Sequence, residues 1–581
     1  MAEQSCYTVA SDGENNPGDE SQSSLSPLQS AVGIDLGSSF CSVAIWRDSK
    51  VEILANPRGL IRMPSHVLFK GDIPWSGVSA PISDAELYSG SAIYLAKCLL
   101  GRADTDQVVQ GCKNCPFLVQ TLDIGARPFL AALVDGVWRS TTPEEVLAIV
   151  LVELRAMAEA QLGHTVRSAV LTMPASFSRF QQTRLERACA MAGLHVLRLM
   201  PEPTAVALLY AQEQQKGLHD NMGSGIEKNV LIFNAGAGFC DAAIAATAGG
   251  VSQIRAIAGD NIGGNAMVQN LVNHVLNEYV SSAEGKSGLS FSKLSAQVVP
   301  LAEKVMHVLS TSASAVLDFE IHGRRISKTI NRQEFEHINE DILKRCEALV
   351  LQCLHQTQAT VDSLDDVIFI GGCSSVPAIR SLVLKACGKK QAYNGIDPLE
   401  AAVQGAAMEG AIASGLTDPS GRLDLLTIQA VPHSLGFRVS GDEFLPVLQK
   451  NGALPARRDV AVTTSYDNQT EALIIVYEGE SKKASDNHLL GFFKLMQIPA
   501  APKGTALINV CMDVDASDVL RVVVGVCMPG IEKPVLPLVE VRMPTIDDGH
   551  GWCTDAIRSK YGSLLDLDVL PLPKPPVPSP K

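Results

Sequence analysis

The sequence predicts a duplicated α/β domain followed by a β-rich module. Two glycine-rich turns between apolar strands, in residues 31–43 and 229–241, indicate the duplication. A third apolar strand, residues 367–370, runs directly into another pair of glycines. Short apolar runs separated by turn residues, between residues 432 and 526, indicate a β-sandwich.

The first glycine-rich turn reads AVGIDLGSSFCSV over residues 31–43. Asp35 lies at the end of an apolar strand, and Gly37, Ser38 and Ser39 form the turn before a second strand begins. Small residues let backbone N–H groups approach an anion, and a carboxylate beside such a turn can hold the water shell of Mg²⁺. For one such turn taken alone, a simple hairpin is the alternative.

The second turn repeats the pattern as NVLIFNAGAGFCD over residues 229–241, with Asn234, Gly236, Ala237, Gly238 and Asp241. The third strand adds Gly371 and Gly372. Three glycine-rich turns after apolar strands favour phosphate binding over unrelated hairpins. We therefore expect a nucleotide in the cleft of a duplicated α/β domain.

Composition excludes several other classes of protein. The chain has 581 residues and a net charge of −14, which argues against general nucleic-acid binding. Its 14 cysteines include one C-x-x-C pair, Cys112 and Cys115, without a second pair or nearby histidines, so we expect neither zinc nor redox use. The start resembles neither a signal nor a transit peptide, and no apolar run reaches membrane-spanning length. We expect a cytosolic protein with no membrane partner.

The chain in order begins with a polar, acidic stretch, residues 1–28, that predicts a disordered tail. Residues 91–102 predict a short helix carrying Lys97, which is a surface lysine unless it folds toward Asp35. Thr142 and Pro143 begin a helix to about residue 162, followed by a strand at 168–173 and a helix at 179–192. Glu202, between two prolines, is expected to be stiff and nonhelical. It is either a structural bridge or a positioned catalytic group.

The β-rich module is predicted from six apolar runs with near-regular spacing: residues 444–448, 460–464, 472–476, 489–495, 506–510 and 519–524. Such a sandwich can bind an extended peptide through backbone hydrogen bonds and one or two apolar pockets. An interaction module with no peptide groove is the alternative.

Four segments resemble the Hsp70 chaperone family in their order and spacing: GIDLGSSFCSV, MPEPTAVALLY, NVLIFNAGAGF and VIFIGGCSSVP. The resemblance continues through the apolar residues 425–428 and the β-rich module, and covers roughly residues 30–525. It implies an actin-like, duplicated ribonuclease-H-like ATPase domain at 29–418, a linker at 419–430 and a β-sandwich peptide-binding domain at 431–526. The Pro-rich residues 527–581 lack the long periodicity of the family's helical lid, as in plant-type Hsp70-like proteins without one.

The resemblance also implies roles for individual residues and ATP or ADP with Mg²⁺ as ligands. Catalytic roles fall to Asp35, Lys97, Glu202 and Asp241, and Asp35 and Asn234 would face Mg²⁺ through water. Nucleotide contacts fall to Gly37, Ser38, Ser39, Phe40, Gly236, Ala237, Gly238, Glu303, Ser310, Gly371, Gly372 and Cys373. Peptide contacts fall to Phe437, Val462, Thr463 and Ile474, and the linker residues are Leu425, Leu426 and Ile428.

Several positions depart from the family's pattern. Asn234 replaces an aspartate that faces Mg²⁺ and water, Phe239 replaces a threonine, and Ala237 replaces a glycine. Met306, His307 and Ser375 replace a lysine and two arginines of the nucleoside pocket, and Leu399 replaces an aspartate. Ser176 and Gln182 replace a tyrosine and an arginine that relay the nucleotide state. We expect slow or impaired ATP hydrolysis.

The resulting hypothesis is a divergent Hsp70-type chaperone and heat-shock protein that holds or folds unfolded clients in a stress response. Its expected partners are extended apolar peptide segments, J-domain proteins and nucleotide exchange factors, with no nucleic acid. One alternative is a nucleotide-insensitive scaffold or holdase that binds a partner protein. Another, a sugar kinase or filament protein on the same fold, is disfavoured by the β-rich module.

Overall fold

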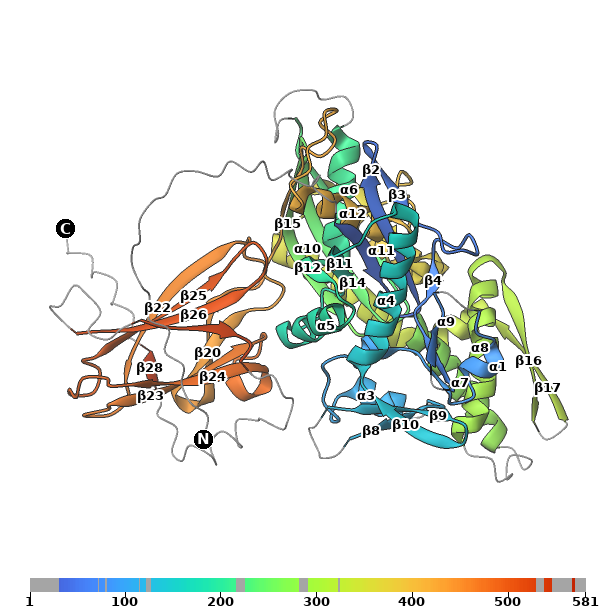
Figure 1. Cartoon of the computed structure of the whole chain (residues 1–581), viewed down its shortest axis with the longest axis horizontal. Helices are drawn as coiled ribbons and strands as arrows, with labels where there is room; N and C mark the ends of the chain where they lie inside the picture. Colours follow the sequence, from blue (N-terminus) through green and yellow to red (C-terminus); the bar gives the residue numbers. More distant parts are fainter. Residues whose placement is uncertain are drawn as a thin grey trace, which may run out of the picture.

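The computed structural model describes residues 31–71, 73–78, 81–113, 115–121, 127–215, 225–281, 291–321, 324–528, 538–545 and 567–569. The tail predicted at residues 1–28 lies outside them. Figure 1 shows two bodies, a larger α/β body with its sheets among helices and a smaller body made of strands.

The first large sheet has the strand order β12-β11-β1-β2-β3, with β4 beside β2. Its strand β1 runs parallel to β11 and antiparallel to β2, so the first glycine-rich turn joins two neighbouring antiparallel strands. The strands are β1 (Val32–Leu36), β2 (Phe40–Arg47), β3 (Lys50–Ile53), β4 (Met63–Pro64), β11 (Ser168–Met173) and β12 (His195–Pro201).

The second large sheet has the order β18-β13-β14-β15-β19, and its strands β18-β13-β14-β15 repeat the arrangement of β11-β1-β2-β3. Strand β13 runs parallel to β18 and antiparallel to β14, so the second glycine-rich turn occupies the equivalent place. The strands are β13 (Lys228–Ala235), β14 (Cys240–Ala248), β15 (Val251–Asp260), β18 (Asp366–Ile370) and β19 (Leu426–Ile428).

Three smaller sheets, ordered β10-β9-β8, β6-β5-β7 and β16-β17, extend the α/β body. Their strands are β5 (Val67–Lys70), β6 (Ile73–Ser76), β7 (Ala92–Ile93), β8 (Leu118–Gln120), β9 (Phe129–Val134), β10 (Val137–Thr141), β16 (Ser314–Ile321) and β17 (Arg324–Asn331).

Helices α6 and α12 form the junction of the two halves. A Cβ on Gly405 of α12 would lie 2.0 Å from the carbonyl oxygen of Ala205 in α6, and one on Gly33 of β1 would lie 2.1 Å from the Ala407 nitrogen. Only glycine allows these backbones to approach so closely. The helices are α1 (Asp84–Leu87), α2 (Ala96–Leu99), α3 (Gln107–Cys112), α4 (Pro143–Leu162), α5 (Arg179–Met191), α6 (Glu202–Gln215), α7 (Gly264–Ser281), α8 (Phe291–Thr311), α9 (Arg332–Ile338), α10 (Glu340–Thr357), α11 (Pro377–Ala386) and α12 (Ala401–Ala413).

Local sequence signals account for some helix ends and fail at others. The Thr142 hydroxyl accepts a hydrogen bond from the Glu145 N–H and begins α4, as its sequence predicts. The expectation that Glu202 is nonhelical is wrong, because α6 begins at this residue. Its neighbour Pro203 lies in the first turn, where a missing N–H costs no helical hydrogen bond. The helix expected over 91–102 is also shorter, because β7 precedes α2 and Leu95 takes φ 62° between them.

The smaller body is a β-sandwich of two sheets, ordered β21-β20-β23-β24 and β27-β26-β25-β22-β28. Each of the six predicted apolar runs overlaps one of its strands, and β27 and β28 extend it beyond residue 526. The strands are β20 (Leu435–Val439), β21 (Glu443–Leu448), β22 (Ala456–Thr464), β23 (Glu471–Glu478), β24 (His488–Met496), β25 (Leu507–Val514), β26 (Leu520–Cys527), β27 (Val539–Met543) and β28 (Leu567–Val569).

The sandwich is docked against helix α5 of the α/β body. The Arg179 guanidinium, with 4% of the residue exposed, lies 2.5 Å from the Asp518 carboxylate in the β25–β26 turn. The Arg179 backbone N–H donates a 2.9 Å hydrogen bond to Glu478 Oε2 at the end of β23. In Figure 1, α5 lies on the side of the α/β body that faces the sandwich. The predicted linker residues Leu426 and Ile428 lie in β19, which pairs in parallel with β15, and Leu425 is buried.

Glu478 is the buried acid of this contact. Burial raises the pKa of its carboxyl from 4.5 to about 7, although the Arg179 charge and N–H oppose the rise. Among the described residues Oε1 has no hydrogen-bond partner, which fits a carboxyl that retains its proton.

A raised folded-state pKa makes the contact pH-sensitive. The stability from a protonated Glu478 is complete below pH 4.5 and is lost as the pH rises through about 7. Glu478→Gln, which resembles the protonated form, should therefore reduce the loss of stability between pH 5 and pH 8 by on the order of 2 kcal/mol. Calorimetric unfolding at several pH values measures this, with the exposed Glu443→Gln as control. Identical pH profiles for Glu478→Gln and the unmodified chain would contradict it.

Candidate nucleotide-binding site

A cavity of about 620 Å³ lies where the glycine-rich turns of the two large sheets face each other. The turns after β1, β13 and β18 line it together with helix α8. The sequence-predicted residues that line it are Asp35, Gly37, Ser38, Ser39, Phe40, Lys97, Glu202, Asn234, Gly236, Ala237, Gly238, Glu303, Ser310, Gly371, Gly372 and Cys373. Asp241 is fully buried behind this surface.

A cluster of charged side chains occupies one end of the cavity. Lys97 Nζ lies 3.2 Å from Glu202 Oε1, and only 2% of Lys97 is exposed. The Asn234 amide donates to Glu202 Oε2 at 2.5 Å and to Asp241 Oδ2 at 3.2 Å. The backbone N–H of Ala175 donates to the other oxygen of Asp241 at 3.1 Å. The cluster thus joins α2, α6 and the second sheet.

Burial raises the pKa of both aspartates of this site. The pKa of Asp35 rises from 3.8 to about 6, because desolvation and the Glu202 charge outweigh Lys97 and a hydrogen bond from Thr172. The pKa of Asp241 rises from 3.8 to about 8, again through desolvation and Glu202, against the hydrogen bonds from Asn234 and Ala175. One lysine does not compensate the two buried aspartates and the partly exposed Glu202, so the site favours a cation or a proton.

Lys97 points inward because of the backbone that precedes it. Leu95 adopts the left-handed conformation with φ 62° and places Lys97 in the first turn of α2. A leucine in this conformation is strained by about 1 kcal/mol or more, and such strain is common at functional sites. Nothing in the sequence signals this backbone conformation. The sequence left Lys97 either on the surface or folded inward, and in the structure it is buried.

The two glycine-rich turns pack tightly against each other. A Cβ on Gly238 would lie 2.6 Å from Ser38 Oγ and 2.5 Å from Cys98 Sγ. The second turn is fastened to the start of α7, where Gly264 and Asn265 donate their N–H groups to Gly236 and Ala237. The Ala237 carbonyl oxygen therefore holds the turn against α7, and the same residue lines the cavity.

Phe239 fills the space beside the charged cluster. Its ring makes an edge contact with Phe177 at a centroid distance of 5.6 Å, and Lys97 Nζ lies 5.8 Å from its centroid. Only 3% of Phe239 is exposed. The ring takes part in the packing of the α/β body and excludes water from Lys97.

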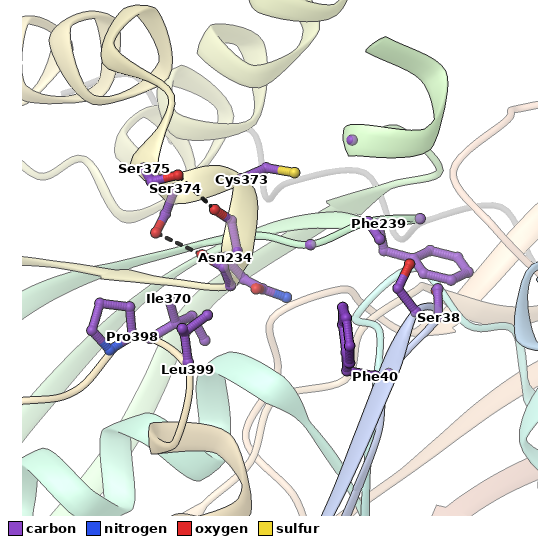
Figure 2. A pocket seen from close by; sticks show the side chains of 18 of the residues that line it. Ser38, Phe40, Asn234, Phe239, Ile370, Cys373, Ser374, Ser375, Pro398 and Leu399 are labelled. Carbon is purple, nitrogen blue, oxygen red and sulfur yellow. Dashed lines mark hydrogen bonds between the residues drawn. The ribbon is translucent and has the colours of Figure 1, made fainter. Parts of the chain in front are cut away.

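The cavity also has apolar walls. Figure 2 shows Ile370, Pro398 and Leu399 on one side, and Ser38, Phe40 and Phe239 on the other, with Asn234 between them. Met306 and His307 of α8 and Ser375 also line the cavity, where the resemblance implies a lysine and two arginines. The Ser375 hydroxyl donates to the Gly372 carbonyl at 2.8 Å, so it stabilises its own turn.

Sequence reasoning missed two cations that line the cavity, Arg62 and Arg380. Arg62 immediately precedes β4, whose Pro64 pairs with Phe40. The Arg380 guanidinium stacks over Phe369 at 4.5 Å from the ring centroid. Arg380 lies five residues beyond Ser375, where helical periodicity in α11 could have suggested a substitute cation. Arg62 lies outside any motif.

The polar end fits a hydrated magnesium ion better than a directly coordinated metal. Within the described residues, no group of three or more His, Cys, Asp and Glu side chains could hold a metal ion directly. Asp35, Glu202 and the Asn234 amide oxygen present hard oxygen atoms, which suit Mg²⁺ that keeps its waters. Gly371 leaves room for that amide oxygen, since a Cβ there would lie 2.7 Å from it.

The predicted peptide-contact residues lie together in the sandwich. Phe437, Val462 and Ile474 belong to one cluster of fully buried side chains, and Thr463 is buried beside them. They come from β20, β22 and β23.

The geometry defines a class of protein with a nucleotide-type cleft between two similar sheets and a β-sandwich that follows a short linker strand. A family model described as Hsp70 protein matches residues 31–535. Heat shock 70 kDa protein 8 of Arabidopsis thaliana is 54% identical over 572 residues, covering 98% of this chain and 99% of that protein. Heat shock 70 kDa protein 2 of Paracoccidioides lutzii is 34% identical over 497 residues, covering 85% of this chain and 74% of that protein.

The chain belongs to the Hsp70 family. The family has an actin-like ATPase domain and a β-sandwich substrate-binding domain, and its members generally bind ATP or ADP with Mg²⁺, unfolded polypeptides and co-chaperones. None of the described helices is long and apolar enough to cross a membrane.

The hydrogen bonds of Asn234 predict how an added negative charge in this cluster changes the stability of the protein. Asn234→Asp replaces the amide donor between Glu202 and Asp241 with a fourth carboxyl group, so it should lower the free energy of unfolding by about 1–3 kcal/mol without Mg²⁺. Mg²⁺ with nucleotide should reduce that loss. Thermal unfolding with and without Mg-ATP measures both effects. Asn331→Asp is the control, because aspartate also caps helix α9. Equal stability of Asn234→Asp and the control variant in Mg²⁺-free buffer would contradict the prediction.

Proposed function

We propose that this chain is an Hsp70-type chaperone that binds ATP in the cavity, holds unfolded clients in the sandwich and hydrolyses ATP slowly. The observation that carries the proposal is the Asn234 amide, which binds two carboxylates where the family has a further carboxylate. An amide accepts no proton from water, and its N–H groups are already used by Glu202 and Asp241. The loss of one positioned group of this kind typically slows a reaction roughly a hundred- to a thousandfold.

The roles that we propose for the other residues follow their positions. Lys97 would neutralise charge on the transferred phosphoryl group, and Glu202, Asp35 and Asp241 would order water around Mg²⁺. The backbones of the glycine-rich turns would hold the phosphates. The apolar walls would bind the nucleoside with fewer cations than usual, so each lost arginine would weaken binding by about 1 kcal/mol.

The proposal extends to the organisation of the chain. We place the nucleotide-binding domain at 29–418, the linker at 419–430 and the substrate-binding domain at 431–526. The short segment 527–581 adds strands β27 and β28 to this domain, and we propose that it forms no full lid. The matching strand orders of the two large sheets support a duplicated ribonuclease-H-like domain. We propose that the protein acts in the cytosol during a stress response, together with J-domain proteins and nucleotide exchange factors.

A nucleotide-insensitive scaffold is the second candidate, and the interdomain contact favours it. Arg179 and Asp518 hold the sandwich against α5 without involving the cavity. Gln182, at a position where the family relays the nucleotide state, has an amide nitrogen with no partner among the described residues. If ATP leaves protease cleavage at Leu425–Ile428 unchanged, this candidate is preferred.

Calorimetric titration tests nucleotide binding. Mg-ATP should bind with micromolar affinity and show turnover far below that of an Hsp70 with an intact site. Asn234→Asp should raise turnover at least tenfold, because it restores a carboxylate beside the attacking water. Asn331→Asp serves again as the control. The absence of heat up to millimolar nucleotide would refute ATP binding and leave the scaffold.

An aggregation assay tests client holding. The chain should suppress light scattering of a heat-denatured client, and Phe437→Ala should weaken suppression because Phe437 is buried among the peptide-contact residues. Phe444→Ala is the matched control, because Phe444 packs in a separate cluster with Leu473 and Tyr477. The loss of Phe437 can cost about 3–5 kcal/mol of stability, so circular dichroism must first show that both variants are folded. No suppression by the unmodified chain would overturn the chaperone proposal.

A further inference from the structure

The edge of the sandwich sheet at β22 carries an additional short strand from the C-terminal segment. Strand β28, residues Leu567–Val569, pairs antiparallel with the end of β22. In this register Val462 faces Val569, Thr463 faces Asp568, and Thr464 faces Leu567. Two of these three β22 residues, Val462 and Thr463, are the ones to which we assign client-peptide contacts.

The side chain of Leu567 is buried in the apolar core of the sandwich. Only 1% of this residue is exposed, and it belongs to the cluster of buried side chains that contains Phe437, Val462 and Ile474. A leucine of the C-terminal segment thus shares one apolar cluster with three of the residues assigned to peptide binding. Extended backbone pairing plus a buried anchor is the general mode by which a peptide adds to a sheet edge.

Two serines close the site around this strand. The Ser440 hydroxyl, from the connection between β20 and β21, donates to the Leu567 carbonyl at 3.3 Å. It also lies 3.3 Å from the hydroxyl of Ser465, which directly follows β22. The segment is therefore held by backbone pairing with β22, by a hydrogen bond from the Ser440 hydroxyl and by the burial of its leucine.

We propose that residues 567–569 are an internal ligand of the client-peptide groove, so that a client must displace the chain's own C-terminal segment before it binds. This inference rests on the proposed peptide-binding function of the sandwich. A tethered ligand acts at an effective concentration of about a millimolar, so even weak intrinsic binding competes with micromolar clients. The segment also indicates which clients fit: extended peptides with a central leucine.

The test uses the full chain and a labelled synthetic peptide of residues 563–573, SLLDLDVLPLP. Leu567→Asp removes the anchor from the tethered copy, so this variant should bind the added peptide at least about tenfold more tightly than the unmodified chain, as expected for losing a buried leucine. Leu538→Asp is the matched control, because Leu538 is 63% exposed just before β27. Fluorescence anisotropy measures the affinities.

In Leu567→Asp, the strand could shift by two residues, so that Leu565 or Val569 takes the place of Leu567 in the register. A second variant excludes this rescue because Leu565, Leu567 and Val569 are all changed to Asp. Amide hydrogen exchange over residues 462–464 should then become faster than in the unmodified chain and in Leu538→Asp. Unchanged exchange and equal peptide affinity across all four proteins would overturn the inference.

An unrelated labelled heptapeptide with a central leucine separates this inference from the chaperone proposal. If the Leu567→Asp variant binds the chain's own peptide but not the heptapeptide, the internal ligand stands and client binding fails. If the unmodified chain and Leu567→Asp bind the heptapeptide equally and neither binds the chain's own peptide, client binding stands and the internal ligand is overturned. If neither protein binds either peptide, both fail.

Discussion

The pairing of buried charge around Asn234 is the interaction on which the α/β body depends. Carboxyl groups from the first sheet, from α6 and from the second sheet meet around one lysine and one amide. Unpaired charge at this depth would cost several kcal/mol, so Lys97 and the Asn234 amide stabilise the fold whatever their chemical role. The Asn234 amide donates to two of these carboxyl groups, which reduces their repulsion but leaves the cluster with an excess of negative charge.

The same cluster is connected to the sandwich through a short piece of chain. The Asp241 carboxylate accepts the Ala175 N–H, and four residues later Arg179 contacts Glu478 and Asp518. Residues 175–179 therefore contact the nucleotide cavity's charged cluster at one end and the substrate-binding body at the other.

Much of this arrangement follows from local sequence. Glycine-rich turns, the Thr142 cap and the alternating runs of the sandwich are signals within a few residues of the feature they specify, and the structure contains each of them. The positions of Lys97 and Arg62 could not be predicted, because they depend on a strained leucine and on the register of β4 against β2. The nonhelical backbone expected for Glu202 is wrong, because a proline breaks a helix in its interior but is tolerated in its first turn. Strand β28 was missed because three residues carry no periodicity, and their partner lies about a hundred residues away in the chain.

Strand β22 illustrates how one edge of the sandwich avoids pairing with other copies of the chain. An exposed edge strand is a template for aggregation. The first part of β22 carries the exposed charges Arg457, Arg458 and Asp459, which disfavour association with another edge. The last part, Val462–Thr464, has no charged side chain and is covered by β28. Pairing with the C-terminal segment thus protects this stretch of edge, as the charges protect the first part of the strand.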